Sequence, residues 1–212
     1  MIQPKPVAST LDLKKIVSVE SGDPLIQWKG IWARRQVAQK LENIQKKLKI
    51  IDSRYDLLIA EGYRTPEYQE RYFLQQFLIE YQKAPSLPLD VLIEKTHAFV
   101  ALPSVAGHPT GGAVDVTLLW EGIELDMGCK IADFSDPSIL PTFSTAISPT
   151  QAKNRELLHD LMLSEEFAPF YGEWWHFSYG DREWAVFYNF LETRFSPVLK
   201  IPPFQRTPAS AL

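Results

Sequence analysis

Residues 107–119 read GHPTGGAVDVTLL, a glycine-rich loop that runs directly into a strand. Apolar side chains at positions 114, 116 and 118 alternate with polar ones, which predicts a half-buried strand with Asp115 on its polar face. Gly111 and Gly112 allow the backbone to fold back, so His108 and Asp115 could converge on one metal ion. A histidine near a Gly-Gly turn is more often a solvated loop residue, and both interpretations stay open for this segment alone.

Helical and extended segments flank this stretch on both sides. Thr65 followed by Pro66 is typical of a helix start, and it places Arg64 at a strand-to-helix junction. Ser148 with Gln151 forms a capping box that opens a later helix. The predicted elements, in chain order, are a helix at 31–50, a strand at 55–60, a helix at 66–82, the strand at 113–119, a helix at 149–162, an aromatic strand at 173–179 and a helix at 181–194.

The length of 212 residues suits one domain, and the sequence shows neither internal repeats nor a domain boundary. We therefore expect a single domain over residues 1–212. Residues 1–28 are punctuated by prolines, and we expect an irregular N-terminal arm there. Residues 196–212 are again proline-rich and predict a peripheral tail.

Composition excludes several classes of protein. With 45% hydrophobic and 23% charged residues the chain is globular and not disordered. The formal net charge of −4 argues against nucleic acid as a partner, because no cationic surface is expected that could neutralise phosphates. Cys129 is the single cysteine, which excludes an intramolecular disulfide and a thiolate-rich zinc site.

No window approaches the roughly 18 consecutive apolar residues of a membrane span. The amino terminus also lacks the apolar stretch of about 7–15 residues that a secretory leader contains. The expected location is therefore the cytoplasm. A periplasmic location stays open as the alternative for a chain whose leader has been removed.

A second chemical unit is the sequence EWWH at residues 173–176. Positions three apart in a regular strand face opposite sides, so Glu173 and His176 share a site only if the chain bends between them or if Glu173 belongs to the preceding turn. The alternative is an aromatic core strand whose histidine is hydrogen-bonded within the fold.

Together the two units provide a zinc-binding set. His108, Asp115 and His176 are three ligands, which leaves the fourth tetrahedral position for water, as hydrolytic zinc requires. Glu173 is then a free carboxylate that can take a proton from that water. Arg64 is a candidate to stabilise a developing oxyanion, with a surface arginine after a turn as the alternative.

These segments resemble the zinc D-alanyl-D-alanine dipeptidases (VanX-like), which are related to D,D-carboxypeptidases. The family pattern S-x-H-x-x-G-x-A-x-D is similar to AGHPTGGAVD at residues 106–115, except at its first position. The family motifs E-W-W-H and G-Y-R match residues 173–176 and 62–64, and a Met-Gly segment lies between them at 127–128. The resemblance spans roughly residues 32–179.

The resemblance implies an α+β metallopeptidase domain in which helices flank a small, mainly antiparallel sheet that carries the metal. It implies that His108, Asp115 and His176 bind one Zn²⁺ per chain. It further implies that Glu173 is the general base and that Arg64 stabilises the transition state. The implied substrate is D-alanyl-D-alanine or a similar small D-amino-acid dipeptide.

Substrate contacts implied by the resemblance fall on Tyr63, Asp133, Trp174 and Trp175. The family serine two residues before the first ligand is Ala106 here. The family aspartate that holds the substrate ammonium corresponds to Ala132, so either Asp133 replaces it through a local shift or the anchor for the ammonium has changed.

Two other functions remain as alternatives. The first is a D,D- or L,D-carboxypeptidase acting on peptidoglycan stem peptides, which the Trp-Trp pair disfavours within the family resemblance. The second is a non-catalytic binding module stabilised by zinc. A closed structural zinc site has no use for an unliganded carboxylate, so Glu173 disfavours it.

Overall fold

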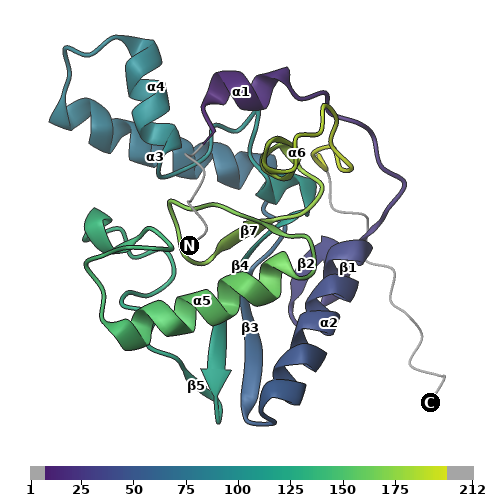
Figure 1. Cartoon of the computed structure of the whole chain (residues 1–212). Coiled ribbons are helices and arrows are strands. Elements are labelled where there is room, and N and C mark those ends of the chain that lie inside the picture. Colours follow the sequence, from purple (N-terminus) through teal and green to yellow (C-terminus); the bar gives the residue numbers. More distant parts are fainter. Residues whose placement is uncertain (1–7, 200–212) are drawn as a thin grey trace.

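A five-stranded antiparallel sheet is the centre of the computed structural model, which describes residues 8–199 (Figure 1). The strands lie in the order β3-β4-β7-β6, and β5 pairs with β4. This small antiparallel sheet with flanking helices confirms the predicted α+β class. The strand bounds are β3 Tyr55–Glu61, β4 Ala113–Trp120, β5 Ile123–Glu124, β6 Ala168–Pro169 and β7 His176–Ser178.

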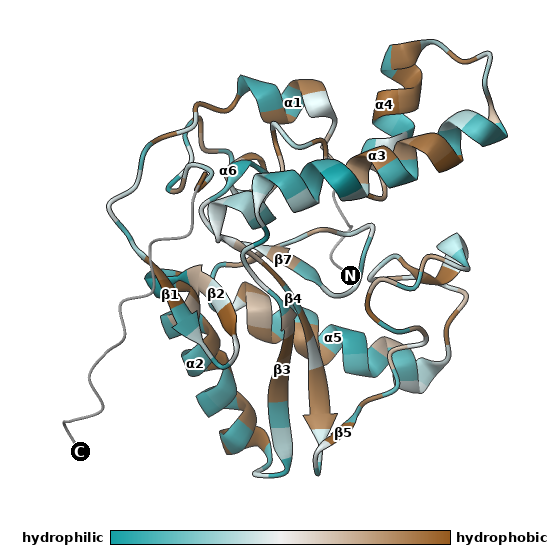
Figure 2. Ribbon diagram, turned by 180° about the vertical axis from the view of Figure 1, so that it is seen from behind, coloured by the Kyte–Doolittle hydropathy of each residue, from teal (hydrophilic) through white to brown (hydrophobic). Residues whose placement is uncertain are grey.

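Two helices, α2 (Arg35–Ile51) and α5 (Pro149–Leu163), cover one face of this sheet (Figures 1 and 2). The apolar stripe of α2 is fully buried, as its helical spacing predicted. The helix packs against β3, and Figure 2 shows hydrophobic residues along β3 and β4. The capping box of Ser148 with Gln151 is present at the start of α5. The core therefore lies between these helices and the sheet.

The remaining helices gather at the end of the sheet where β3 finishes and β4 begins (Figure 1). They are α1 (Thr10–Lys15), α3 (Pro66–Lys83), α4 (Leu89–His97) and α6 (Arg182–Phe187). The side chain of Thr65 caps α3 as predicted. Helix α4 was not predicted, since residues 89–107 carry a weak apolar pattern.

The prediction for the amino-terminal third is wrong in two places. Residues 8–28 are not an irregular arm, because they include α1 and the strand β1 (Leu25–Trp28). The predicted helix at 31–50 begins only at Arg35, because residues 31–34 form strand β2 (Ile31–Arg34), which pairs with β1. Lys29 and Gly30 both have positive φ, which is typical of the two-residue turn that closes such a hairpin. Residues 1–7 lie outside the described part.

The carboxy-terminal helix is shorter than the predicted 181–194, since α6 ends at Phe187. The first residues of the predicted tail pack onto the fold, where the Val198 backbone N–H donates to the carbonyl of Pro109. Residues 200–212 lie outside the described part. Within residues 8–199, no helix has both the length and the apolar character that crossing a bilayer would require.

Candidate metal centre

Three neighbouring strands place acidic and imidazole side chains in one row. In the strand register, Glu61 of β3 is opposite Asp115 of β4, and Asp115 is opposite His176 of β7. Directly paired residues on antiparallel strands have side chains on the same face of the sheet. A register shift between Ile59 and Glu61 marks a β-bulge, a feature that commonly re-aims side chains next to active sites.

His108 joins this row from the loop before β4. Residues 108–110 form the short 3-10 helix η1, which Gly111 ends with a left-handed φ of 73°. A Cβ atom at Gly112 would lie 2.4 Å from the carbonyl oxygen of Tyr179, so this position accepts no side chain. The two glycines therefore fold the loop back onto the sheet, as the sequence indicated.

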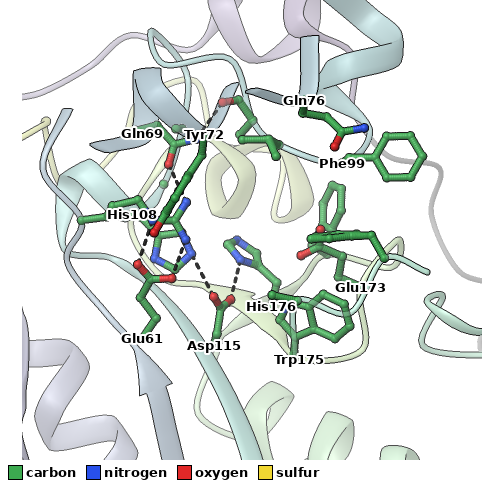
Figure 3. Close-up of a pocket in the computed structure, with 18 of the residues that line it drawn as sticks. Glu61, Gln69, Tyr72, Gln76, Phe99, His108, Asp115, Glu173, Trp175 and His176 are labelled. Atoms are coloured by element: carbon green, nitrogen blue, oxygen red, sulfur yellow. Dashed lines mark hydrogen bonds and ion pairs between the residues drawn. The ribbon is translucent and has the colours of Figure 1, made fainter. Parts of the chain in front are cut away.

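The three predicted ligands meet. His108, Asp115 and His176 each offer a ligand atom within 4.8 Å of the others (Figure 3). Asp115 lies between the two rings, 3.4 Å from His108 Nε2 and 3.0 Å from His176 Nδ1. A metal ion with bonds of about 2.0–2.1 Å to such donors fits between atoms at these separations.

The outer ring nitrogens fix the tautomers that a metal ligand needs. His108 Nδ1 donates to the carbonyl oxygen of Gly62 at 2.7 Å, which leaves Nε2 free to bind an ion. His176 Nε2 lies 3.6 Å from Oε2 of Glu183, and Nδ1 is the nitrogen that faces Asp115 in the site, at 3.0 Å. Partners of this kind orient metal-binding histidines in many proteins. The donor set therefore fits one divalent ion such as zinc.

The charges of Asp115 and of the neighbouring histidines shift the pKa values of these groups in the site. Burial by itself disfavours the charge of Asp115, but the two neighbouring histidines outweigh burial and lower the pKa of this carboxyl. Burial likewise opposes the positive charge of His176, but the neighbouring carboxylates of Asp115 and Glu183 raise its pKa well above the ordinary value. The site thus holds one carboxylate in a form that can bind a cation.

Glu173 lies in the turn before β7, which is one of the two conditions required for it to share a site with His176. It is 8% exposed and lines the same pocket as the three ligands (Figure 3). Burial raises the pKa of Glu173 to about 8, and the nearby Asp115 and Glu183 carboxylates act in the same direction. A carboxyl group with this pKa can both accept and return a proton near neutral pH.

Arg64 is held in place by two partners at the pocket edge. Its Nε donates to Glu61 at 2.8 Å, and one terminal nitrogen donates to the side-chain oxygen of Gln69 at 2.9 Å. Burial disfavours its charge, but the contacts with Glu61 outweigh burial and raise the pKa of Arg64. The guanidinium is therefore a fixed cation and not a surface side chain.

These groups face one cavity of about 560 Å³. Pockets of about 300–1,000 Å³ are the usual size for small-molecule ligands. Its walls come from β3, α3, the segment after α4, the loop at 131–134, and the strand ends. The apolar lining includes Phe99, Ile131, Phe134, Phe170 and Trp175.

Of the four residues predicted to bind substrate, Trp175 lines the pocket and the other three do not. Trp175 lines the pocket, as do Ala106 and Ala132. Trp174 does not line it, because its indole N–H points to the sulfur of Cys129, at 3.3 Å. Tyr63 does not line it either, since its hydroxyl donates to the carbonyl of Val198.

The expectation that Asp133 replaces the family ammonium anchor is not met in this structure. Asp133 is exposed, is not among the residues that line the pocket, and accepts a hydrogen bond from the backbone N–H of Ser135. Ala132 precedes it with a positive φ of 59°, a turn that a sequence pattern does not reveal. The pocket therefore has no carboxylate from this loop.

Three polar residues of the site were missed from the sequence. Glu61 and Gln69 hold Arg64, and Glu183 faces His176. Glu61 directly precedes the Gly-Tyr-Arg motif, so its position was a usable signal. Glu183 carried no such signal, because only the packing of α6 brings it to the metal ligands.

A buried set of three ligands beside a free carboxylic acid and a fixed arginine is typical of metal-dependent hydrolases. Residues 24–198 match the peptidase M15 family, whose description is D-ala-D-ala dipeptidase, and the chain belongs to this peptidase family. The chain is 29% identical over 185 residues to a D-alanyl-D-alanine dipeptidase of Synechocystis sp., covering 74% of this chain and 72% of that relative.

A D-alanyl-D-alanine dipeptidase of Enterococcus faecalis is 31% identical over 145 residues, covering 64% of this chain and 68% of the relative. Among solved structures, VanYB in complex with D-alanine-D-alanine superposes with a TM-score of 0.50 at 16% identity, over 81% of this chain and 86% of that one. At that identity the likeness shows a common fold alone.

Proposed function

We propose that this peptidase is a zinc-dependent dipeptidase that hydrolyses D-alanyl-D-alanine or a closely similar D-amino-acid dipeptide. The observation that carries the proposal is that His108, Asp115 and His176 converge in a pocket that Glu173 and Arg64 also line. The substrate is proposed from the two relatives that carry the name D-alanyl-D-alanine dipeptidase.

The metal and Glu173 would divide the chemistry between them. Zinc supplies Lewis acidity, which acidifies water and polarises a carbonyl group. Glu173 takes a proton from the attacking water and delivers it to the leaving amine. Glu173 suits both steps by its position, since it lines the same pocket as His108, Asp115 and His176 and is not among the three side chains that converge as candidate ligands.

Arg64 would stabilise the charge that develops on the scissile carbonyl oxygen. Glu61 and Gln69 hold the guanidinium, so it does not have to reorganise as the reaction proceeds. The N–H groups of Arg64 that these partners do not use remain available to the substrate.

A turnover assay with metal analysis tests this proposal. We expect the zinc-loaded protein to release free D-alanine from D-alanyl-D-alanine, and we expect Glu173→Ala to keep zinc but lose hydrolysis. Full hydrolysis by Glu173→Ala, or a purified protein that binds no zinc, would overturn the mechanism.

The size of the pocket favours one second candidate, a D,D- or L,D-carboxypeptidase. A cavity of about 560 Å³ has room for more than two alanine residues. Comparing the specificity constant, kcat/KM, for the free dipeptide with that for a muramyl pentapeptide separates the two activities. A higher value for the pentapeptide would replace the dipeptidase assignment.

A further inference from the structure

His97 is a buried histidine in the pocket wall that none of the chemistry above uses. It ends helix α4, is 3% exposed and lines the same cavity as the metal ligands. Its Nδ1 accepts a hydrogen bond from the backbone N–H of Leu102 at 3.1 Å. A neutral imidazole that accepts at Nδ1 carries its hydrogen on Nε2, so Nε2 is a donor.

That donor has no hydrogen-bond partner among the residues that the structure describes. Six buried side-chain atoms within residues 8–199 lack a hydrogen-bond partner, and only His97 Nε2 belongs to a residue that lines the pocket. A buried donor left unpaired disfavours the folded state, and such a group in a binding pocket is therefore expected to meet a ligand atom. The missing partner of His97 is best supplied by the substrate.

The chemistry of an N–H donor restricts what that partner can be. Nε2–H binds an oxygen and repels an ammonium group. A dipeptide has two kinds of acceptor, the scissile carbonyl oxygen and the terminal carboxylate. Under the proposed function, on which this inference rests, Arg64 stabilises the carbonyl oxygen, so the carboxylate remains.

Two amide donors of the pocket wall already have a protein partner. The side-chain nitrogen of Gln69 donates to the carbonyl of Ala101, and that of Gln76 donates to Glu80. Arg64 shares its charge with Glu61. We propose that His97 Nε2–H binds the terminal carboxylate of the peptide substrate and makes the enzyme selective for peptides with a free carboxyl end.

Two substitutions separate this role from a structural one. His97→Asn keeps an acceptor near Nδ1 for Leu102 and removes the Nε2 donor. His97→Gln places an amide N–H near Nε2 and gives up the Nδ1 acceptor. If His97 binds the carboxylate, KM for D-alanyl-D-alanine rises at least about tenfold in His97→Asn, with kcat little changed, and His97→Gln recovers most of the loss.

The matched control is His159→Asn. His159 is 1% exposed and also has an unpartnered Nε2, but it does not line the pocket. We expect its KM to stay within about twofold of wild type. The second control is the substrate D-alanyl-ethylamide, which has the scissile amide but no terminal carboxylate, and for which wild type and His97→Asn should have equal KM.

These measurements separate a failure of the His97 role from a failure of the proposed dipeptidase function. If His97→Asn leaves KM for the dipeptide unchanged, or raises KM equally for the dipeptide and D-alanyl-ethylamide, the carboxylate role of His97 is wrong although the dipeptidase activity stands. A weaker affinity for zinc with KM unaltered would instead assign His97 to supporting the metal ligands. If wild-type protein neither binds nor hydrolyses the dipeptide, the proposed function itself fails.

Discussion

Oε2 of Glu183 lies 3.6 Å from Nε2 of His176, on the side of the ring opposite Asp115. His176 thus lies between two carboxylates: Asp115, which is itself a candidate metal ligand, on the Nδ1 side, and Glu183 on the Nε2 side. Burial would raise the pKa of Glu183, but its contact with His176 outweighs burial and lowers that pKa. Glu183 is therefore an anionic partner on the Nε2 side of His176, and Nδ1 faces Asp115.

We predict that Glu183→Ala weakens zinc affinity by about 10–100-fold, because His176 loses the partner that orients its ring. Titration with zinc measures this directly. Glu183→Gln retains an oxygen that can accept from Nε2 and should keep most of the affinity. The control is Glu156→Ala, a change on the exposed face of α5. Equal zinc affinity for Glu183→Ala and wild type would contradict the orienting role.

Arg64 should act on the rate and not on the metal. We predict that Arg64→Ala lowers kcat by about 10²–10³-fold, the loss expected for one oxyanion donor, while zinc affinity stays within about twofold. Arg64→Lys should recover little, since an ammonium cannot make the forked contact with Glu61 together with the contact to Gln69. Kinetics at saturating substrate, paired with zinc titration, tests both variants. If Arg64→Ala loses zinc, Arg64 maintains the structure of the site and the role in stabilising the transition state is wrong.

Glu173 should make the metal-free protein less stable as pH rises. Its pKa of about 8 in the folded chain exceeds the ordinary value of 4.5, so the folded state binds the extra proton. The resulting stabilisation is complete below pH about 4.5 and is lost as pH rises through about 8.

The isosteric variant Glu173→Gln removes this proton equilibrium. We predict that metal-free Glu173→Gln is more stable than metal-free wild type at pH 8 by on the order of a few kcal/mol, with a much smaller difference at pH 5. Urea unfolding at the two pH values measures it. A difference between the proteins that does not depend on pH would show that burial of the carboxyl group is not the cause.

Gly112 should be essential to the loop that carries His108. Gly112→Ala would place a Cβ atom 2.4 Å from a backbone oxygen of Tyr179, which cannot move without breaking the pairing of β4 with β7. We predict a loss of about 1–3 kcal/mol in unfolding free energy. Gly22→Ala, where a Cβ meets no atom within 4 Å, is the matched control. Similar stability of the two variants would argue against the close approach.

The Asp133 carboxylate should be dispensable. Because it is exposed and does not line the pocket, we predict that Asp133→Asn leaves KM for the dipeptide within about twofold of wild type. A large rise in KM would mean that the loop at 131–134 rearranges when substrate binds, and the sequence-based expectation for Asp133 would then be restored.

Within each of the two units the candidate metal-site residues are close in sequence, so their convergence could be predicted from the sequence. His108 and Asp115 are separated by one loop, and Glu173 and His176 by one turn. What joins the two units is the antiparallel pairing of β4 with β7, and the family resemblance supplied that long-range information. The catalytic roles of Glu173 and Arg64 remain predictions.

Other features depend on contacts that periodicity does not encode. Residues 31–34 fit a helical apolar pattern, yet pairing with residues 25–28 makes them a strand. Strand β4 was expected to be half-buried, but Asp115 and Thr117 on its polar face are buried as well. Glu183 and His97 reach the pocket only through the packing of their helices.

We propose above all that two imidazoles and one aspartate hold a single zinc ion. Calorimetric titration of the metal-free protein with zinc, carried out in parallel on wild type and His176→Ala, tests it most directly. We predict one tight site per chain in wild type and none in His176→Ala. Tight binding of one equivalent by both proteins would contradict the assignment, and so would the absence of binding to wild type.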